Sequence, residues 1–225
     1  MSSRNVFASL LLAGSCFAQP EAARRLDAAA SVLGEIMDVA DRAIPQRLLD
    51  RAECVIVVPS LKKGAFIIGG KFGRGFVACR KPGGTGWGAP AGVRVEGGSF
   101  GLQIGGSETD VVMLIMNERG AKRLMTSKFT LGGDASAAAG PVGRTATAET
   151  DAMMTAEILT WSRARGLFAG VSLQGATMRV DQEANQELYG AKLHNRDIVF
   201  SDRATPESAK KLYDMLAKFS SRKSK

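Results

Sequence analysis

The chain has 225 residues, of which 45% are hydrophobic and 23% are charged, so its composition is that of a globular protein rather than a disordered one. Lysine and arginine number 30 against 22 aspartate and glutamate residues, and the net charge of +8 favours anionic partners without naming one. The single histidine, His194, excludes sites that need two or three histidines. The three cysteines, Cys16, Cys54 and Cys79, form no CxxC pair, which excludes a zinc ribbon and a thioredoxin-type centre.

Residues 1–18 have the pattern of a secretory signal peptide. Arg4 precedes an apolar run that is too short to span a bilayer, and cleavage is expected after Ala18, which ends a small-x-small site. The mature protein is then expected to be exported, and periplasmic or outer-membrane associated if the source is Gram-negative. The run AGSC at 13–16 also resembles the site at which a lipoprotein cysteine is acylated, so lipidation of Cys16 is the alternative.

Residues 21–44 are predicted to form an amphipathic helix, because apolar residues recur at steps of three and four and Pro45 follows. Its apolar face is rich in alanine without tryptophan or phenylalanine, which favours packing against a core over lying in a lipid interface. A second helical turn at 46–52 leads into a β-branched run at 54–58. This run is predicted to be a buried strand bounded by Pro59.

Residues 64–106 contain 15 of the 26 glycines, interleaved with apolar and aromatic residues. Flexible linkers lack such side chains, so short strands that turn on glycine are predicted, with an exposed loop at 82–86. Cys54 and Cys79 lie in apolar strand-like runs, which favours buried thiols. A disulfide between them in an oxidising compartment is the alternative, because the sequence does not fix the distance between their Cα atoms.

The second half of the chain alternates strand and helix signals. A buried strand at 110–116 precedes a short helix that Asn117 caps, and residues 158–162 and 167–173 are predicted to form a hairpin. Asp181 is predicted to cap a helix that ends at Gly190.

A last helix is predicted to begin at Thr205-Pro206. The fold class is therefore predicted as α+β, with a glycine-rich, strongly bent antiparallel β-sheet, a barrel-like core and flanking N- and C-terminal helices. The expected organisation is a signal peptide at 1–18, a domain at 21–200, and a C-terminal helix with a basic tail at 201–225.

No pattern predicts an enzyme, a cofactor or a metal site. The glycines and cations of residues 69–75 lack the GxxxxGK[ST] order of a phosphate loop, and the strand-like segment after them does not fit a Rossmann fingerprint. His194 lies in a polar connection and is interpreted as a surface histidine. Asp110 stands at the start of a buried strand and is interpreted as a hydrogen-bonded structural carboxylate.

Positive charge is concentrated in residues 60–100, which carry seven cations against one acid, Glu96. Cations beside exposed aromatic residues suit an anionic membrane surface, with Phe66, Phe72 and Trp87 as candidate apolar contacts. The alternative is that these charges keep the sheet edges soluble. The candidate phosphate-contacting residues are Lys62, Lys63, Lys71, Arg74, Arg80 and Lys81.

Several ordered motifs resemble the SYLF domain family over roughly residues 26–190. They include KGAFIIGGKFGRG at 63–75, GSFGLQIG at 98–105, GPVGR at 140–144 and GLFAGVSL at 166–173. The resemblance implies a lipid-binding module. Eukaryotic members bind phosphoinositides, partly through a basic amphipathic N-terminal segment, some yeast members bind actin, and bacterial members are often short exported proteins.

We therefore expect a non-enzymatic protein that docks on anionic phospholipid through a basic surface. A protein-interaction or structural module of the envelope, with a protein partner, is the second hypothesis. A hydrolase that uses Asp110, Ser99 or Ser136 is the third, and nucleic acid is disfavoured because an exported protein rarely meets it. The docking hypothesis requires that the cations share one side of the molecule and are not neutralised by acids.

Overall fold

The computed structural model describes residues 19–39, 43–66, 68–84, 86–100, 105–126, 128–132, 137–139, 156–164, 167–168, 173 and 175–220. The predicted signal peptide with Cys16, the basic tail at 221–225, the motif at 140–144 and Ser136 lie outside the described residues, as does the side chain of Ser99. Across the ranges given above, no helix is long and apolar enough to cross a membrane.

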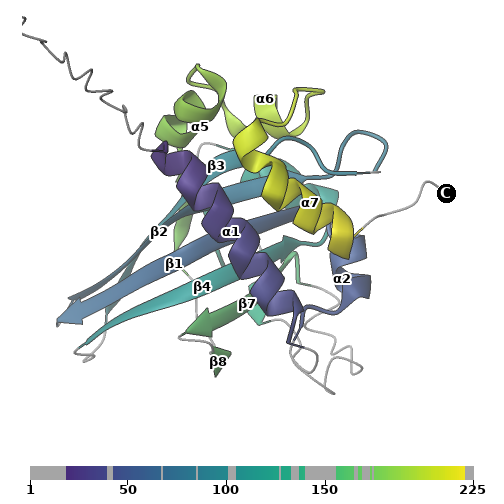
Figure 1. The fold of residues 1–225 in the computed structure, drawn as a ribbon. Coiled ribbons are helices and arrows are strands. Elements are labelled where there is room, and N and C mark those ends of the chain that lie inside the picture. The colour runs from purple at the N-terminus through teal and green to yellow at the C-terminus, as the bar shows by residue number, and fades with distance from the viewer. Residues whose placement is uncertain are drawn as a thin grey trace, which may run out of the picture.

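A twisted, mainly antiparallel sheet forms the centre of the molecule (Figure 1). Its strands are β1 (Cys54–Phe66), β2 (Ile68–Cys79), β3 (Ala91–Phe100), β4 (Gly105–Ile115), β5 (Lys128–Thr130), β6 (Ala137–Ala139), β7 (Ile158–Ala164), β8 (Leu167–Phe168) and β9 (Thr177–Val180). Their spatial order is β5-β9-β3-β2-β1-β4-β7-β6, with β8 on β7 and with β6 and β7 parallel. Within the described strands no pairing joins β5 to β6, so the sheet is open. The predicted α+β class is confirmed, and the barrel-like core is an open sheet.

Helices flank the sheet at both ends of the chain. They are α1 (Glu21–Met37), α2 (Gln46–Arg51), α3 (Glu118–Leu124), α5 (Gln182–Tyr189), α6 (Asn195–Val199) and α7 (Lys210–Phe219), with a 3₁₀ turn at Glu207–Ala209 before α7. Figure 1 shows α1 and α7 side by side across one face of the sheet. One face of α1 is buried, so its interpretation as a core helix is confirmed.

Helix α1 ends at Met37, so the prediction that it extends to residue 44 is wrong. Ile44 fits the helical spacing and is 1% exposed, but it reaches the core from the connection that follows the helix. The residue before a proline is disfavoured in the helical conformation, and Ile44 precedes Pro45.

Alternation along the central strands separates two hydrophobic cores. Val55 and Val57 of β1 face the layer of α1 and α7, whereas Ile56 and Val58 face the side covered by α3, α6 and the curled β9–β5 end of the sheet. The sheet is therefore buried on both sides along its centre.

Strand β1 continues past Pro59, so the prediction of a strand that stops at residue 58 is wrong. The register shifts between Val58 and Leu61, where one extra residue forms a bulge. Ser60 lies in this bulge with a positive φ of 49°, and its N–H donates to Asp110 Oδ1 at 3.0 Å. A bulge accommodates a proline because the ladder hydrogen bond is already interrupted there.

Most glycines of residues 64–106 lie inside strands of 10 to 13 residues, so the prediction of short strands that turn on glycine is wrong. The predicted loop at 82–86 is confirmed in its described part, where Gly83, Gly84 and Gly86 have positive φ. Gly75 serves a different purpose. A Cβ atom on it would lie 2.0 Å from the carbonyl oxygen of Val57, so glycine allows β2 to approach the bulge in β1.

Short-range predictions in the second half of the chain are confirmed. The side chain of Asn117 accepts the N–H of Gly120 at the start of α3, and that of Asp181 accepts the N–H of Ala184 at the start of α5. Gly190 ends α5 in the left-handed conformation. The predicted hairpin is present as β7 paired with β8, and its continuation at 169–172 lies outside the described residues.

Cys54 and Cys79 form a disulfide, so the favoured interpretation as buried thiols is wrong. The two residues stand directly opposite each other on β1 and β2, with Cα atoms 3.9 Å apart. Only the strand register brings them together, and the sequence did not fix that register.

Candidate anion-binding surfaces

The six predicted cations do not form one surface. Lys62, Lys63 and Lys71 lie toward the far end of the β1–β2 hairpin, where the two strands meet. Arg80 and Lys81 follow the opposite end of β2, and Arg74 stands in its middle. Each group has a different environment.

Arg80 is 3% exposed, so its predicted contact with a lipid phosphate is wrong. Its guanidinium lies 3.8 Å from the ring centre of Trp87 and donates to the carbonyl oxygens of Leu49 at 3.3 Å, Ala52 at 3.4 Å and Ser220 at 3.1 Å. These oxygens end helices α2 and α7, where carbonyl groups lack helical partners and carry partial negative charge. Arg80 therefore fastens two helix ends to the sheet.

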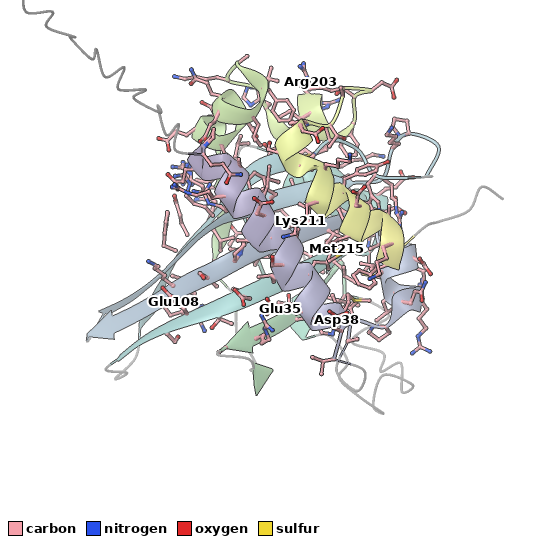
Figure 2. The ribbon with its side chains drawn as sticks, viewed as in Figure 1. Glu35, Asp38, Glu108, Arg203, Lys211 and Met215 are labelled. Carbon is pink, nitrogen blue, oxygen red and sulfur yellow. A yellow bond between two sulfur atoms is a disulfide. The ribbon has the colours of Figure 1, made fainter. Side chains whose placement is uncertain are left out.

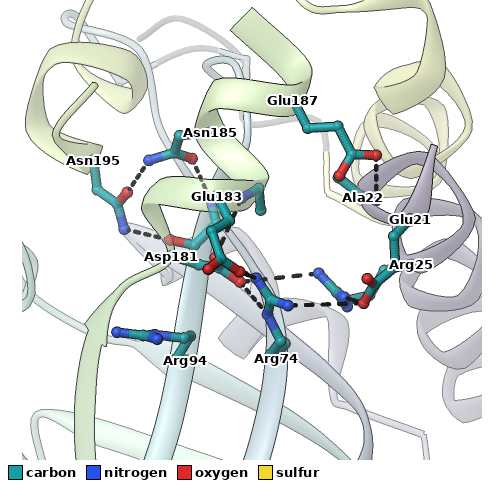
Figure 3. A network of polar contacts seen from close by, with 12 residues as sticks. Glu21, Ala22, Arg25, Arg74, Arg94, Asp181, Glu183, Asn185, Glu187 and Asn195 are labelled. Atoms are coloured by element: carbon teal, nitrogen blue, oxygen red, sulfur yellow. Dashed lines mark hydrogen bonds and ion pairs between the residues drawn. The ribbon is translucent and has the colours of Figure 1, made fainter. Parts of the chain in front are cut away.

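Arg74 is held in an ion-pair network between β2, α1 and α5 (Figure 3). Its Nε and Nη2 donate to the two carboxylate oxygens of Asp181 at 2.6 and 2.7 Å, and Nη2 also donates to Glu183 at 2.8 Å. Glu21 of α1 lies 3.8 Å from its Nη1, and Arg25 lies 3.9 Å from Asp181. Three carboxylates thus surround two guanidinium groups.

The network keeps its central pair charged. The hydrogen bond to Asp181 is the main cause that raises the pKa of Arg74. Asp181 is 1% exposed, and this burial raises its pKa. The effect of burial is outweighed by the hydrogen bonds that Asp181 accepts from Arg74 and the Ala184 amide and by the charges of Arg74 and Arg25. The pKa of Asp181 therefore lies below its ordinary value of 3.8. Arg74 is neutralised by acids, and this corrects its assignment as a phosphate contact.

Lys81 is exposed on the rim of a groove of about 1020 Å³ between the β2–β3 loop, α3 and α6. Lys122 and Arg196 share this rim, but so do Glu53 and Glu118. The two glutamates cancel most of the charge of these three exposed cations and leave the rim at +1.

The three lysines at the far end of the hairpin remain as candidates. The register places Lys63 directly opposite Lys71, and Lys62 opposite Phe72. Because successive strand residues point to opposite faces, the expected single side is not found, and the first pair lies on one face of the hairpin and the second on the other. The side chain of Lys62 is 67% exposed, and its ion pair with Glu108 at 3.6 Å is exposed on both sides, so solvent screens it. Partial burial, followed by the charge of Lys63, lowers the pKa of Lys71.

We call Lys62, Lys63, Lys71 and Phe72 the distal hairpin. In Figures 1 and 2 this end of β1, β2 and β4, including Glu108 on β4, extends beyond the layer of α1 and α7. Phe72 is 48% exposed, as expected for an apolar contact, whereas Trp87 is fully buried and that expectation is wrong. The side chain of Phe66 lies outside the described part of the chain.

Two further arginines, which were not candidates, continue across the sheet from Arg74. Arg94 on β3 is paired with Arg74 on β2 and with Arg179 on β9, and Lys128 on β5 is paired with Arg179. Four neighbouring strands therefore carry a row of cations on one face. No signal in the sequence indicates this row, because β9 pairs with strands far from it in the chain.

Asp110 is confirmed as a hydrogen-bonded structural carboxylate. Besides the N–H of Ser60, it binds Arg163, whose Nη2 lies 3.3 Å from Oδ2. In the residue ranges that the structure describes, no group of three or more histidine, cysteine, aspartate or glutamate side chains could hold a metal ion.

Comparison with known proteins matches the chain to one family model and to several relatives. The model of the Ysc84 family, described as Las17-binding protein actin regulator, matches residues 96–219. SH3 domain-containing YSC84-like protein 1 is 32% identical over 198 residues in Xenopus laevis and 31% identical over 197 residues in Homo sapiens, and both matches cover 85% of this chain. Protein YSC84 of Saccharomyces cerevisiae is 33% identical over 180 residues, which cover 79% of this chain. The matches cover 58%, 57% and 38% of these three relatives, respectively, so the chain corresponds to only part of each.

Proposed function

Since this chain belongs to the Ysc84 (SYLF) family, we propose that it is a non-enzymatic module that docks on anionic phospholipid through its distal hairpin. The observation that carries the proposal is that the end of the hairpin extends past the helices with basic side chains on both of its faces, Lys62 beside the half-exposed Phe72 on one and Lys63 with Lys71 on the other. Headgroups around this end would contact both faces. Arg74 and Arg80 have no part in it, because both serve the fold.

The energetics favour an anionic surface over a neutral one. Each lysine near anionic headgroups contributes about 1 kcal/mol, so the three together contribute about 3 kcal/mol at low salt. Burial of the exposed part of Phe72 adds about 1 kcal/mol whatever the headgroup charge. Glu108 beside Lys62 subtracts from the total, and salt weakens the charge-dependent part.

Vesicle sedimentation of the full chain tests the proposal. Neutral phosphatidylcholine vesicles are compared with vesicles that contain phosphatidylglycerol, at low and high salt. The variant with Lys62→Gln, Lys63→Gln and Lys71→Gln should lose roughly 100-fold in affinity for the anionic vesicles, the equivalent of about 3 kcal/mol. Replacing phosphatidylglycerol by a phosphoinositide at equal charge tests a headgroup preference.

The matched control removes three exposed cations at the opposite end of the molecule, with Lys81→Gln, Lys122→Gln and Arg196→Gln. It changes the net charge by the same amount and should bind almost as the unmodified protein does. Equal affinity for neutral and anionic vesicles, or equal losses in the two triple variants, would refute docking through the distal hairpin.

We also propose that the protein is exported, with residues 1–18 as its signal peptide. The Cys54–Cys79 disulfide supports this proposal, because disulfides persist in oxidising compartments. Mass spectrometry of the protein purified from its host should find Gln19 as the first residue. A mature protein that begins with an acylated Cys16 would instead establish a lipoprotein, and retention of Met1 in the cytoplasm would refute export.

A protein partner is the second candidate function, and the description of the matching family as Las17-binding and actin-regulating favours it. Cosedimentation of the full chain with filamentous actin tests the actin-related form of this candidate. Saturable binding that the distal-hairpin variant retains would place the partner surface elsewhere on the molecule. The absence of sedimentation would remove actin as a partner of this chain.

A further inference from the structure

A second group of basic side chains lies around an open cavity between β3, β9 and the segment around α5. Arg94, Arg179, Lys192 and His194 line a cavity of about 380 Å³, together with Gln182 and the two carboxylates beside it, Asp181 and Glu183. This volume is at the small end of the range for ligand sites in proteins. The cavity is distinct from the distal hairpin and from the groove beside Lys81.

The two acids that line this cavity are ion-paired with Arg74. Both carboxylate oxygens of Asp181 accept hydrogen bonds from Arg74, and Glu183 accepts a hydrogen bond from the same guanidinium group. Glu96 is shared between the two lining arginines, 3.8 Å from Arg94 Nε and 3.5 Å from Arg179 Nε. Both distances exceed an ordinary hydrogen bond.

The lining guanidinium groups retain donors for a ligand. Arg94 Nε is shielded from solvent and has no hydrogen-bond partner among the described residues. Arg94 and Arg179 stand directly opposite each other on β3 and β9, where like charges destabilise a sheet. An anion that both arginines bind would offset this repulsion.

The charge count indicates the class of ligand. Arg94, Arg179 and Lys192 carry three permanent positive charges, and Arg74 behind the cavity adds a fourth. Asp181, Glu183 and the shared Glu96 cancel three of them, which leaves +1. A phosphomonoester carries about −1.5 to −2 at pH 7 and offers three acceptor oxygens. Two arginine forks bind such a group bidentately.

We propose that this cavity is a binding site for a phosphomonoester, held by Arg94 and Arg179 with Lys192 and His194 as further donors. The site shares no residue with the distal hairpin, so it is tested separately from the proposed docking. That group could be supplied by a soluble phosphate ester or by a lipid headgroup such as that of phosphatidic acid.

Titration calorimetry of the full chain with glycerol 3-phosphate, at constant ionic strength set by sodium chloride, tests the proposal. We expect saturable binding and a rise in melting temperature. Arg94→Gln and Arg179→Gln should each weaken binding at least about tenfold, since each removes charge-assisted hydrogen bonds. Arg179→Lys, which keeps the charge but not the fork, should give a smaller loss.

Thermal unfolding without ligand separates this role from a structural one. Removing one of two opposed arginines should leave the melting temperature unchanged or raise it. If the arginine instead formed a stabilising ion pair, its removal would lower the melting temperature. Lys62→Gln serves as the charge-matched control and should bind glycerol 3-phosphate normally. No saturable binding, or equal binding by all variants, would overturn the proposal.

Vesicles identify the source of the phosphate. Loss of binding to phosphatidic acid vesicles in Arg179→Gln, together with competition by glycerol 3-phosphate, supports a lipid headgroup in the site. Vesicle binding that Arg179→Gln leaves unchanged, alongside weakened binding of glycerol 3-phosphate, supports a soluble ester. Failure of the distal-hairpin test would affect neither result.

Discussion

Replacing Gly75 by alanine tests the close approach between β2 and the bulge of β1. A Cβ atom at this position would lie 2.0 Å from the Val57 carbonyl oxygen and 2.8 Å from Val58 Cα. Both neighbours are backbone atoms of a strand that is paired on both sides, with Val57 opposite Phe76 and Val112. They cannot move aside without breaking ladder hydrogen bonds, so we expect a cost at the upper end of overpacking, about 3 kcal/mol.

Part of that cost is offset, because alanine in a strand is about 0.5–1 kcal/mol better than glycine. The net loss of about 2–2.5 kcal/mol should lower the melting temperature by about 4–10 °C for a protein of this size. Circular dichroism during heating measures it. Gly70→Ala, on the same strand with no atom within 4 Å of the new Cβ, is the control and should be neutral or slightly stabilising. A melting temperature of Gly75→Ala equal to that of the control would refute the packing argument.

Three other predictions concern the contacts that hold the fold. The folded pKa of Asp181 lies below 3.8, so its contribution to the free energy of unfolding is complete above that pH and is lost as the pH falls through the folded pKa. Asp181→Asn should therefore cost about 3 kcal/mol at pH 7. Urea titrations should show this difference in stability shrinking at low pH. Arg80→Met leaves helix-end carbonyls without a donor and should cost about 3 kcal/mol in the same assay, while Lys81→Met at the exposed neighbour should cost almost nothing. Reduction of the Cys54–Cys79 disulfide, which spans 25 residues, should cost about 3 kcal/mol and lower the melting temperature measured with reductant.

Each of these outcomes has a clear contrary result. A stability difference between Asp181→Asn and the unmodified protein that stays constant below pH 3.8 would mean that the Arg74 ion pair does not stabilise the fold. Equal losses of stability in Arg80→Met and Lys81→Met would contradict a stabilising role for the hydrogen bonds from Arg80 to the ends of α2 and α7. A melting temperature that reductant leaves unchanged would contradict a stabilising disulfide.

The cationic candidates show where sequence reasoning reached its limit. Positive charge was correctly located in residues 60–100, but Arg80 proved to be an interior residue and Arg74 an ion-paired one. Local sequence carries no sign of these environments, because the partners Ser220 and Asp181 lie more than a hundred residues away. Arg179 was missed for the same reason.

The amino-acid sequence alone determined the features that arise between near neighbours in the chain. Asn117 and Asp181 cap helices whose N–H groups lie three residues on, and the unbroken apolar, mostly β-branched run at 54–58 marks a strand buried on both faces. Only the tertiary structure decided which charges, cysteines and glycines meet. Strand register and strand order are set by non-local pairing, and a shift of one residue moves a side chain to the opposite face, so these neighbours follow from the assembled sheet.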